Sequence, residues 1–240
     1  MRLPAVVCLS RSFWDDARNG TGEAKLQFVW RQLAAMTARC LITTLALPKC
    51  DIRENVEQLA GLLAQCPALA HLDLRSNSIP QEGACELAEV LGQCSALAHL
   101  NLGDNNIGSA GTQSLASILP QCPVLADLRL HTTRIGPEGA TSLAEVIAQC
   151  RALTRLDLDD NKIEAGGAGS FAEVLTQCTV LTHIDLSWNL IRKAGAESLA
   201  GVLGQCTVLA SLHLDVNSIP DVSKRRLRDS WRGQPDRLFL

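Results

Sequence analysis

The sequence predicts an α/β solenoid, a stack of similar units with parallel strands on one face and helices on the other. Within each unit, leucines first alternate with polar residues and then recur at helical spacing. The 240 residues include no Tyr, 4 Phe and 4 Trp, so the core must be built from small aliphatic side chains in similar, repeated sites. Self-similarity at one fixed period is typical of stacked repeats. The period is 28 residues, and it is marked by Cys66, Cys94, Cys122, Cys150, Cys178 and Cys206.

Each unit follows the frame C-x-x-L-x-x-L-x-L-x-x-N-x-I-x-x-x-G-x-x-x-[LF]-A-x-[VI]-[LI]-x-Q. The x-L-x-L segment alternates with period 2, which predicts a short strand with its leucines turned inward. The Asn that follows is expected to hydrogen-bond backbone groups of the turn. The second half, residues 82–92 in one unit, places Leu87, Ala88 and Leu91 on one face of a helix. One unit cannot bury that face alone, so residues 40–221 are expected to stack as repeats.

Stacking has a geometric consequence for the shape. Parallel strands lie about 4.8 Å apart, whereas helices with their side chains are about 10 Å across. The stack must therefore curve, with the strands on the concave face and the helices on the convex face. Glycines after the turn, such as Gly111 and Gly139, are expected to relieve crowding where the chain enters each helix.

The ends of a solenoid need polar caps. Residues 1–22 are expected to form a loose N-terminal segment, and residues 23–39 a capping helix with four apolar residues at helical spacing. Residues 222–240 are expected to form a capping helix and a last strand, in which Leu238 and Leu240 restore the L-x-L pattern.

A basic run, KRRLR at residues 224–228, allows two interpretations. It is either the charged outer face of the capping helix or a patch for nuclear import or an acidic partner. Asp221 and Asp229 beside the run favour the first interpretation.

The composition argues against a disordered chain and against several classes of partner. An apolar fraction of 47% is too high for a disordered chain. The net charge of −3 provides no basic field for nucleic acid or anionic lipid. No apolar run approaches the length of about 20 residues that spans a bilayer. We therefore expect neither nucleic acid nor a membrane as the partner.

The cysteines indicate the compartment. Equivalent positions of a stack face the same interior, so the six repeated cysteines are expected to be reduced, buried thiols. Reduced thiols indicate the cytoplasm. A signal peptide is disfavoured because Pro4 interrupts the apolar run 3–9 and no A-x-A site follows.

The frame resembles the ribonuclease-inhibitor-like class of leucine-rich repeats. It is also similar to the C-terminal repeats of NOD-like receptors and to the Ran GTPase-activating protein. The resemblance covers about 40–240 and implies a right-handed leucine-rich-repeat horseshoe. Two departures are Thr133, which replaces the Asn, and the use of one repeat type throughout, so ribonuclease inhibition is not assigned.

No catalytic motif is found. H-E-x-x-H and G-x-S-x-G are absent, and residues 20–25 lack the spacing of a phosphate-binding loop. We expect no enzymatic activity, no cofactor and no metal. The resemblance implies two alternatives, GTPase activation of the Ran-activator type and a regulatory repeat protein related to NOD-like receptors. It places no catalytic residue here.

The concave face carries the informative side chains. The outward positions of successive strands form rows that hold all five histidines and eight Asp against four Lys or Arg. Three interpretations stay open: a merely solvated face, a face that binds a protein partner presenting basic side chains, and a metal or pH-sensing role for His71 and His99 on adjacent strands. The partner-binding candidates are Asp157, Asp159, Asp160, Asp185, Trp188, His183, Arg155 and Asp127. The exposed Trp is expected to be the anchor, because such residues dominate interface energetics.

Overall fold

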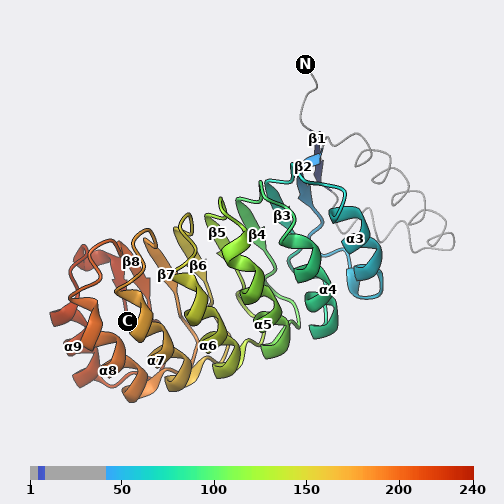
Figure 1. Cartoon of the computed structure of the whole chain (residues 1–240). Coiled ribbons are helices and arrows are strands. Elements are labelled where there is room, and N and C mark those ends of the chain that lie inside the picture. The colour runs from blue at the N-terminus through green and yellow to red at the C-terminus, as the bar shows by residue number, and fades with distance from the viewer. Residues whose placement is uncertain (1–4, 9–41) are drawn as a thin grey trace.

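The computed structural model describes residues 5–8 and 42–240, which form one parallel sheet backed by a row of helices (Figure 1). The strands follow one another across the sheet in chain order. They are β1 (Ala5–Cys8), β2 (Ile42–Ala46), β3 (His71–Asp73), β4 (His99–Asn101), β5 (Asp127–Arg129), β6 (Arg155–Asp157), β7 (His183–Asp185), β8 (Ser211–His213) and β9 (Leu238–Phe239). The α-helices are α3 (Val56–Leu63), α4 (Gln81–Leu91), α5 (Gly108–Ile118), α6 (Gly136–Ile147), α7 (Glu164–Leu175), α8 (Arg192–Leu203) and α9 (Asp221–Ser230). Short 3-10 helices are η1 (Ile52–Asn55), η2 (Leu119–Gln121) and η3 (Pro235–Arg237). Within these ranges no helix is both long and apolar enough to cross a bilayer.

The core lies between the sheet and the helices. Leu72, Leu100 and Leu128 pair in register on adjacent strands, and each is at most 2% exposed. The inward side chains of successive repeats form one continuous hydrophobic cluster. The predicted α/β solenoid, with strands on one face and helices on the other, is confirmed.

Glycines allow the helices to approach one another closely. A Cβ atom on Gly167 of α7 would lie 2.7 Å from the Cβ of Ala140 in α6, and it would also meet Ile163. A Cβ atom on Gly111 of α5 would lie 2.9 Å from the Cβ of Ala84 in α4. Real carbon atoms do not approach this closely, so the predicted role of Gly111 is confirmed, and Gly167 has the same role.

The Asn of each turn is a buried hydrogen-bonding centre that joins two repeats. Asn161 Nδ2 donates to the carbonyl oxygens of Leu158 (3.0 Å) and, in the preceding repeat, Leu130 (2.7 Å). Its Oδ1 accepts from the backbone N–H groups of Thr133 (2.9 Å) and Ile135 (3.2 Å). Thr133 replaces this Asn in its own repeat, and its hydroxyl lies 2.6 Å from the carbonyl oxygen of Leu130 and 3.1 Å from Asn161 Oδ1.

The repeated cysteines form a buried column. Cys94, Cys122, Cys150, Cys178 and Cys206 are free and buried, as predicted. Each sulfhydryl donates to the carbonyl four residues earlier, near the C-terminal end of a helix. Burial, together with the neighbouring Cys122, raises the pKa of Cys150 to about 11, so this thiol stays protonated and able to donate.

The N-terminal end differs from the prediction. The sequence assigned residues 1–22 to a loose segment, but Ala5–Cys8 forms a strand parallel to β2. Val7 packs on the core and the strand covers the edge of β2, whose backbone groups would otherwise lack partners. The expected capping helix 23–39 lies outside the described residues.

At the other end, α9 and β9 follow the last repeat. Leu227 is fully buried, and Arg226 lies 3.5 Å from Glu197 of α8. In the run 224–228, Arg225 and Arg228 are exposed and Lys224 is half-buried, which suits a charged outer helix face. β9 pairs with β8 and continues the sheet.

Candidate functional site

The sheet face, defined as the exposed side of β2–β9 opposite the helices, has the row arrangement that the sequence predicted. One row contains Thr44, His71, His99, Asp127, Arg155, His183 and Ser211, paired from strand to strand. A second contains Ala46, Asp73, Asn101, Arg129, Asp157, Asp185 and His213.

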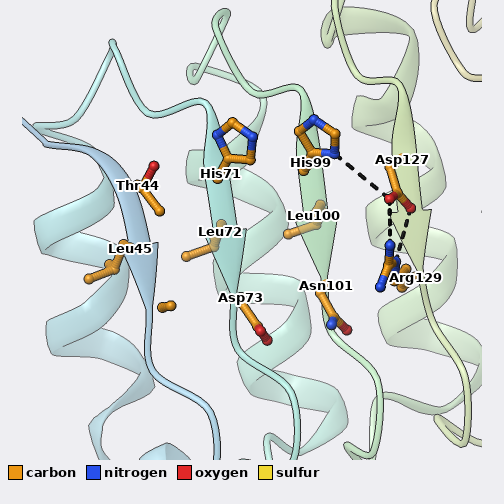
Figure 2. A pocket seen from close by; sticks show the side chains of 11 residues that line it. Thr44, Leu45, His71, Leu72, Asp73, His99, Leu100, Asn101, Asp127 and Arg129 are labelled. Atoms are coloured by element: carbon orange, nitrogen blue, oxygen red, sulfur yellow. Dashed lines mark hydrogen bonds and ion pairs between the residues drawn. The ribbon is translucent and has the colours of Figure 1, made fainter. Parts of the chain in front are cut away.

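Two histidines stack near the N-terminal end of this face. The rings of His71 and His99 lie 4.3 Å apart at an angle of 10°, beside a hollow of about 190 Å³ (Figure 2). His99 Nδ1 lies 3.7 Å from Oδ2 of Asp127, which Arg129 also holds through Nη2 at 2.8 Å. Burial and the neighbouring His99 lower the pKa of His71, which favours a neutral ring. The predicted binding residue Asp127 is therefore already held by His99 and Arg129. Within the described ranges, no three His, Cys, Asp or Glu side chains are grouped as metal ligands would be.

His131 links two acidic positions across neighbouring repeats. Its ring lies over Gly103, which has no side chain to displace it. Nδ1 is 3.2 Å from Asp157 Oδ2, and Nε2 is 3.9 Å from Asp104 Oδ2. The hydrogen bond to Asp157 outweighs burial and raises the pKa of His131. His131 was not among the site residues that the sequence predicted. Gly103, in the same row, leaves space for a large neighbouring side chain and could have indicated it.

Four of the predicted aspartates come together in the acidic cluster, defined as Asp157, Asp159, Asp160 and Asp185. Burial, together with the negative charges of the other three, raises the pKa of Asp159 to about 6. Asp157 Oδ1 accepts the backbone N–H of Asp159 (3.2 Å), and Asp185 Oδ1 accepts that of Ser187 (2.9 Å). These bonds fix the orientation of two of the four carboxylates.

We expect Asp159→Asn to stabilise the fold at pH 7 by up to about 1 kcal/mol. The folded-state pKa is raised, so ionising Asp159 costs stability as the pH rises from about 4, the pKa of an unfolded Asp, to about 6. Solvent screens a half-exposed carboxylate, which limits the size of the effect.

Thermal unfolding between pH 4 and pH 7 measures this effect. The difference in Tm between the variant and the wild type should grow up to about pH 6.5 and then level off. Asp215→Asn, elsewhere on the sheet face, is the control. A Tm difference that did not vary with pH would contradict the electrostatic explanation.

An exposed apolar patch lies beside the acidic cluster. Trp188, Leu190 and Val216 are 57%, 36% and 54% exposed. The backbone N–H of Trp188 donates to the carbonyl of Asp215, which brings neighbouring turns together. All three have φ of 55–56°, a left-handed conformation that costs L-residues about 1–2 kcal/mol. The sequence predicted Trp188 as a site residue and placed Val216 in the same outward row, but it assigned neither Val216 nor Leu190 to the site.

The remaining predicted residues, Arg155 and His183, lie side by side in the first row, at the start of their strands. The last strand adds two residues that the sequence analysis missed. The Phe239 ring stacks on His213 at 4.0 Å, and Arg237 immediately precedes β9. The sequence predicted this last strand from Leu238 and Leu240, but it did not assign Phe239 or Arg237 to the site.

Comparison with known proteins identifies the repeats. A family model described as "Leucine Rich repeat" matches residues 93–116, 149–172 and 177–200. A solved structure named "Leiomodin-1 Actin-Binding Site 2 (ABS2)" superposes with a TM-score of 0.53 at 18% identity, covering 62% of this chain and 89% of that chain. A search of curated proteins found no match. At this identity the likeness shows the fold alone, and the narrower resemblance to NOD-like receptors and the Ran activator stays a prediction.

Proposed function

We propose that this leucine-rich-repeat solenoid is a non-catalytic module that binds a basic, partly apolar segment of a protein partner on its sheet face. The repeats and the leucine-rich-repeat neighbour support a protein-interaction module in general. The chemistry of the partner is argued from the acidic cluster and from the patch of Trp188, Leu190 and Val216.

One observation carries the proposal: an apolar patch adjoins the acidic cluster, in which three carboxylates surround Asp159. Repulsion contributes to the raised pKa of Asp159, so a Lys or Arg entering the cluster would replace repulsion with attraction. Trp188 beside it offers a large apolar contact area, and exposed Trp residues are frequent interface anchors. Backbone hydrogen bonds between neighbouring turns hold the main chain that carries these side chains, so less backbone entropy is lost on association.

The other ionisable groups of the sheet face suit charge recognition better than proton transfer. Asp127 is held by Arg129, and His131 by Asp157. We also propose a cytoplasmic location, because a column of protonated thiols suits a reducing compartment. The name of the leiomodin-1 structure specifies actin binding, so actin is included in the test as a purified probe.

The test compares protein capture by the wild type with capture by Trp188→Ala and Asp185→Asn, using quantitative mass spectrometry of a cytosolic extract. Each substitution should reduce recovery of the sheet-face partner about tenfold, because each removes part of a central contact. Val124→Ala, which trims an exposed apolar side chain in a different loop, should leave recovery unchanged. Purified actin is assayed in parallel by co-sedimentation.

If both variants keep their circular dichroism spectrum and recover every partner as the wild type does, the proposed face is wrong. A large acceleration of GTP hydrolysis, when the wild type is added to a loaded small GTPase, would instead favour the rival activity.

A further inference from the structure

A second, basic hollow lies between the strands and the C-terminal cap. Its volume is about 760 Å³. Arg155 and His183 line it from β6 and β7, Arg232 and Arg237 from the cap, and Val208 from the loop before β8. Among the described residues that line it, none is an aspartate or a glutamate.

The strand register explains why these residues converge. Arg155, His183 and Ser211 lie in one row on adjacent strands. Arg237 comes directly before Leu238, which pairs with the residue after Ser211, so it extends the same row. The buried Ser211 is small, which leaves space between its larger neighbours.

The cap segment that carries two of the arginines is itself held in place. Trp231 Nε1 donates to the carbonyl of Gln234 at 2.9 Å. The backbone N–H of Arg237 donates to the same carbonyl at 2.9 Å. Arg232 lies between these anchors, so both guanidinium groups arise from a short, hydrogen-bonded loop.

No described carboxylate neutralises the three arginines of the hollow. Across residues 5–8 and 42–240, no ion pair to a carboxylate is found for Arg155, Arg232 or Arg237. Arg129 and Arg226, by contrast, each have a carboxylate partner.

The pKa of His183 is sensitive to the same positive charges. Burial lowers its pKa, and the charges of Arg155 and Arg237 lower it further. Thr182 Oγ1 donates its proton to the carbonyl of Thr154 (3.0 Å), so His183 Nδ1 is the donor in its 2.8 Å contact with Thr182. That assignment leaves Nε2 as the ring nitrogen that gains a proton when a bound anion stabilises the cation.

We propose that this hollow binds a phosphate group carried by a phosphorylated segment of a protein partner. Planar guanidinium groups bind phosphate oxygens in pairs, and a dianion matches several of them better than one carboxylate does. Val208, 37% exposed at the edge, offers an apolar contact for the side chain beside the phosphorylated residue. The inference relies on the proposed function only in that the ligand belongs to a protein.

The experiment uses a fluorescein-labelled degenerate nonapeptide library with phosphoserine fixed at its centre, and the same library with serine. Fluorescence anisotropy should show the phosphoserine library binding the wild type at least tenfold more tightly than the serine library. Arg237→Gln and Arg155→Gln should each weaken phosphopeptide binding about tenfold. Arg225→Gln removes the same charge from an exposed position that does not line the hollow, and it should bind as the wild type does.

Three outcomes would overturn the inference: equal binding of the two libraries, wild-type binding by the folded Arg237 and Arg155 variants, or inorganic phosphate binding as tightly as the phosphopeptides. The assay leaves the acidic cluster and Trp188 intact. A failure here, with capture still dependent on Trp188, would therefore remove the phosphate site and leave the proposed function standing.

Discussion

Replacing Asn161 with alanine is expected to lower the free energy of unfolding by about 4 kcal/mol. The side chain is fully buried, and its Oδ1 accepts from the backbone N–H groups of Thr133 and Ile135. Alanine leaves both groups buried without this acceptor, and each such group costs about 1–3 kcal/mol. The two carbonyl oxygens that Asn161 Nδ2 contacts each keep another donor. Leu130 still accepts from Thr133, and Leu158 still accepts from Asn189.

Urea denaturation followed by circular dichroism measures this loss. Asn106→Ala is a matched control, since Asn106 is an exposed turn residue whose Oδ1 accepts only from the exposed Arg134 side chain. It should change stability by less than about 0.5 kcal/mol. Similar losses for the two variants would show that the turn Asn of the repeat is not a structural centre.

Gly167→Ala is expected to destabilise the protein by about 2–3 kcal/mol. The added methyl group would lie 2.7 Å from Ala140 Cβ and would also press on Ile163. Ala140 and Ile163 are both fully buried, so neither can move away without disturbing the packing of α6 on α7. The clash exceeds the modest gain in helix propensity that alanine brings.

Gly169→Ala, in the same helix, should have the opposite sign. A Cβ atom at Gly169 would meet nothing within 4 Å, so only the helix propensity changes. The expected gain is about 0.5–1 kcal/mol. Urea midpoints of the two variants, compared with the wild type, check both values. Two shifts in the same direction would contradict the close helix contact.

Together, the two proposals predict the orientation of a partner segment bound along the sheet face. At β6 the strand begins at Arg155, beside the basic hollow, and continues through Asp157 toward the acidic cluster. A partner segment lying along the strands would place its phosphate at one end and its basic side chains at the other. Opposite charges at the two ends would select one orientation of the segment and disfavour the reverse.

The sequence alone could predict most of the fold. The 28-residue period, the inward leucines and the buried thiols follow from local periodicity, and Leu100 and Cys150 lie where that periodicity places them. The rows of the sheet face also follow, because a constant repeat length leaves no freedom in register. The candidate anchor Trp188 could be identified because it is aromatic at a position that is polar in most other repeats.

The pairing of side chains was decided only by the tertiary structure. His131 reaches Asp157 because Gly103 leaves space for its ring, and Arg129 rather than solvent holds Asp127. The basic hollow exists because the cap turns back to add one more strand beside β8. Periodicity specifies where each Cα lies relative to its neighbours. Which charged side chains meet depends on side-chain conformations and on the space that small residues leave. The consensus sequence of the repeat specifies neither of these.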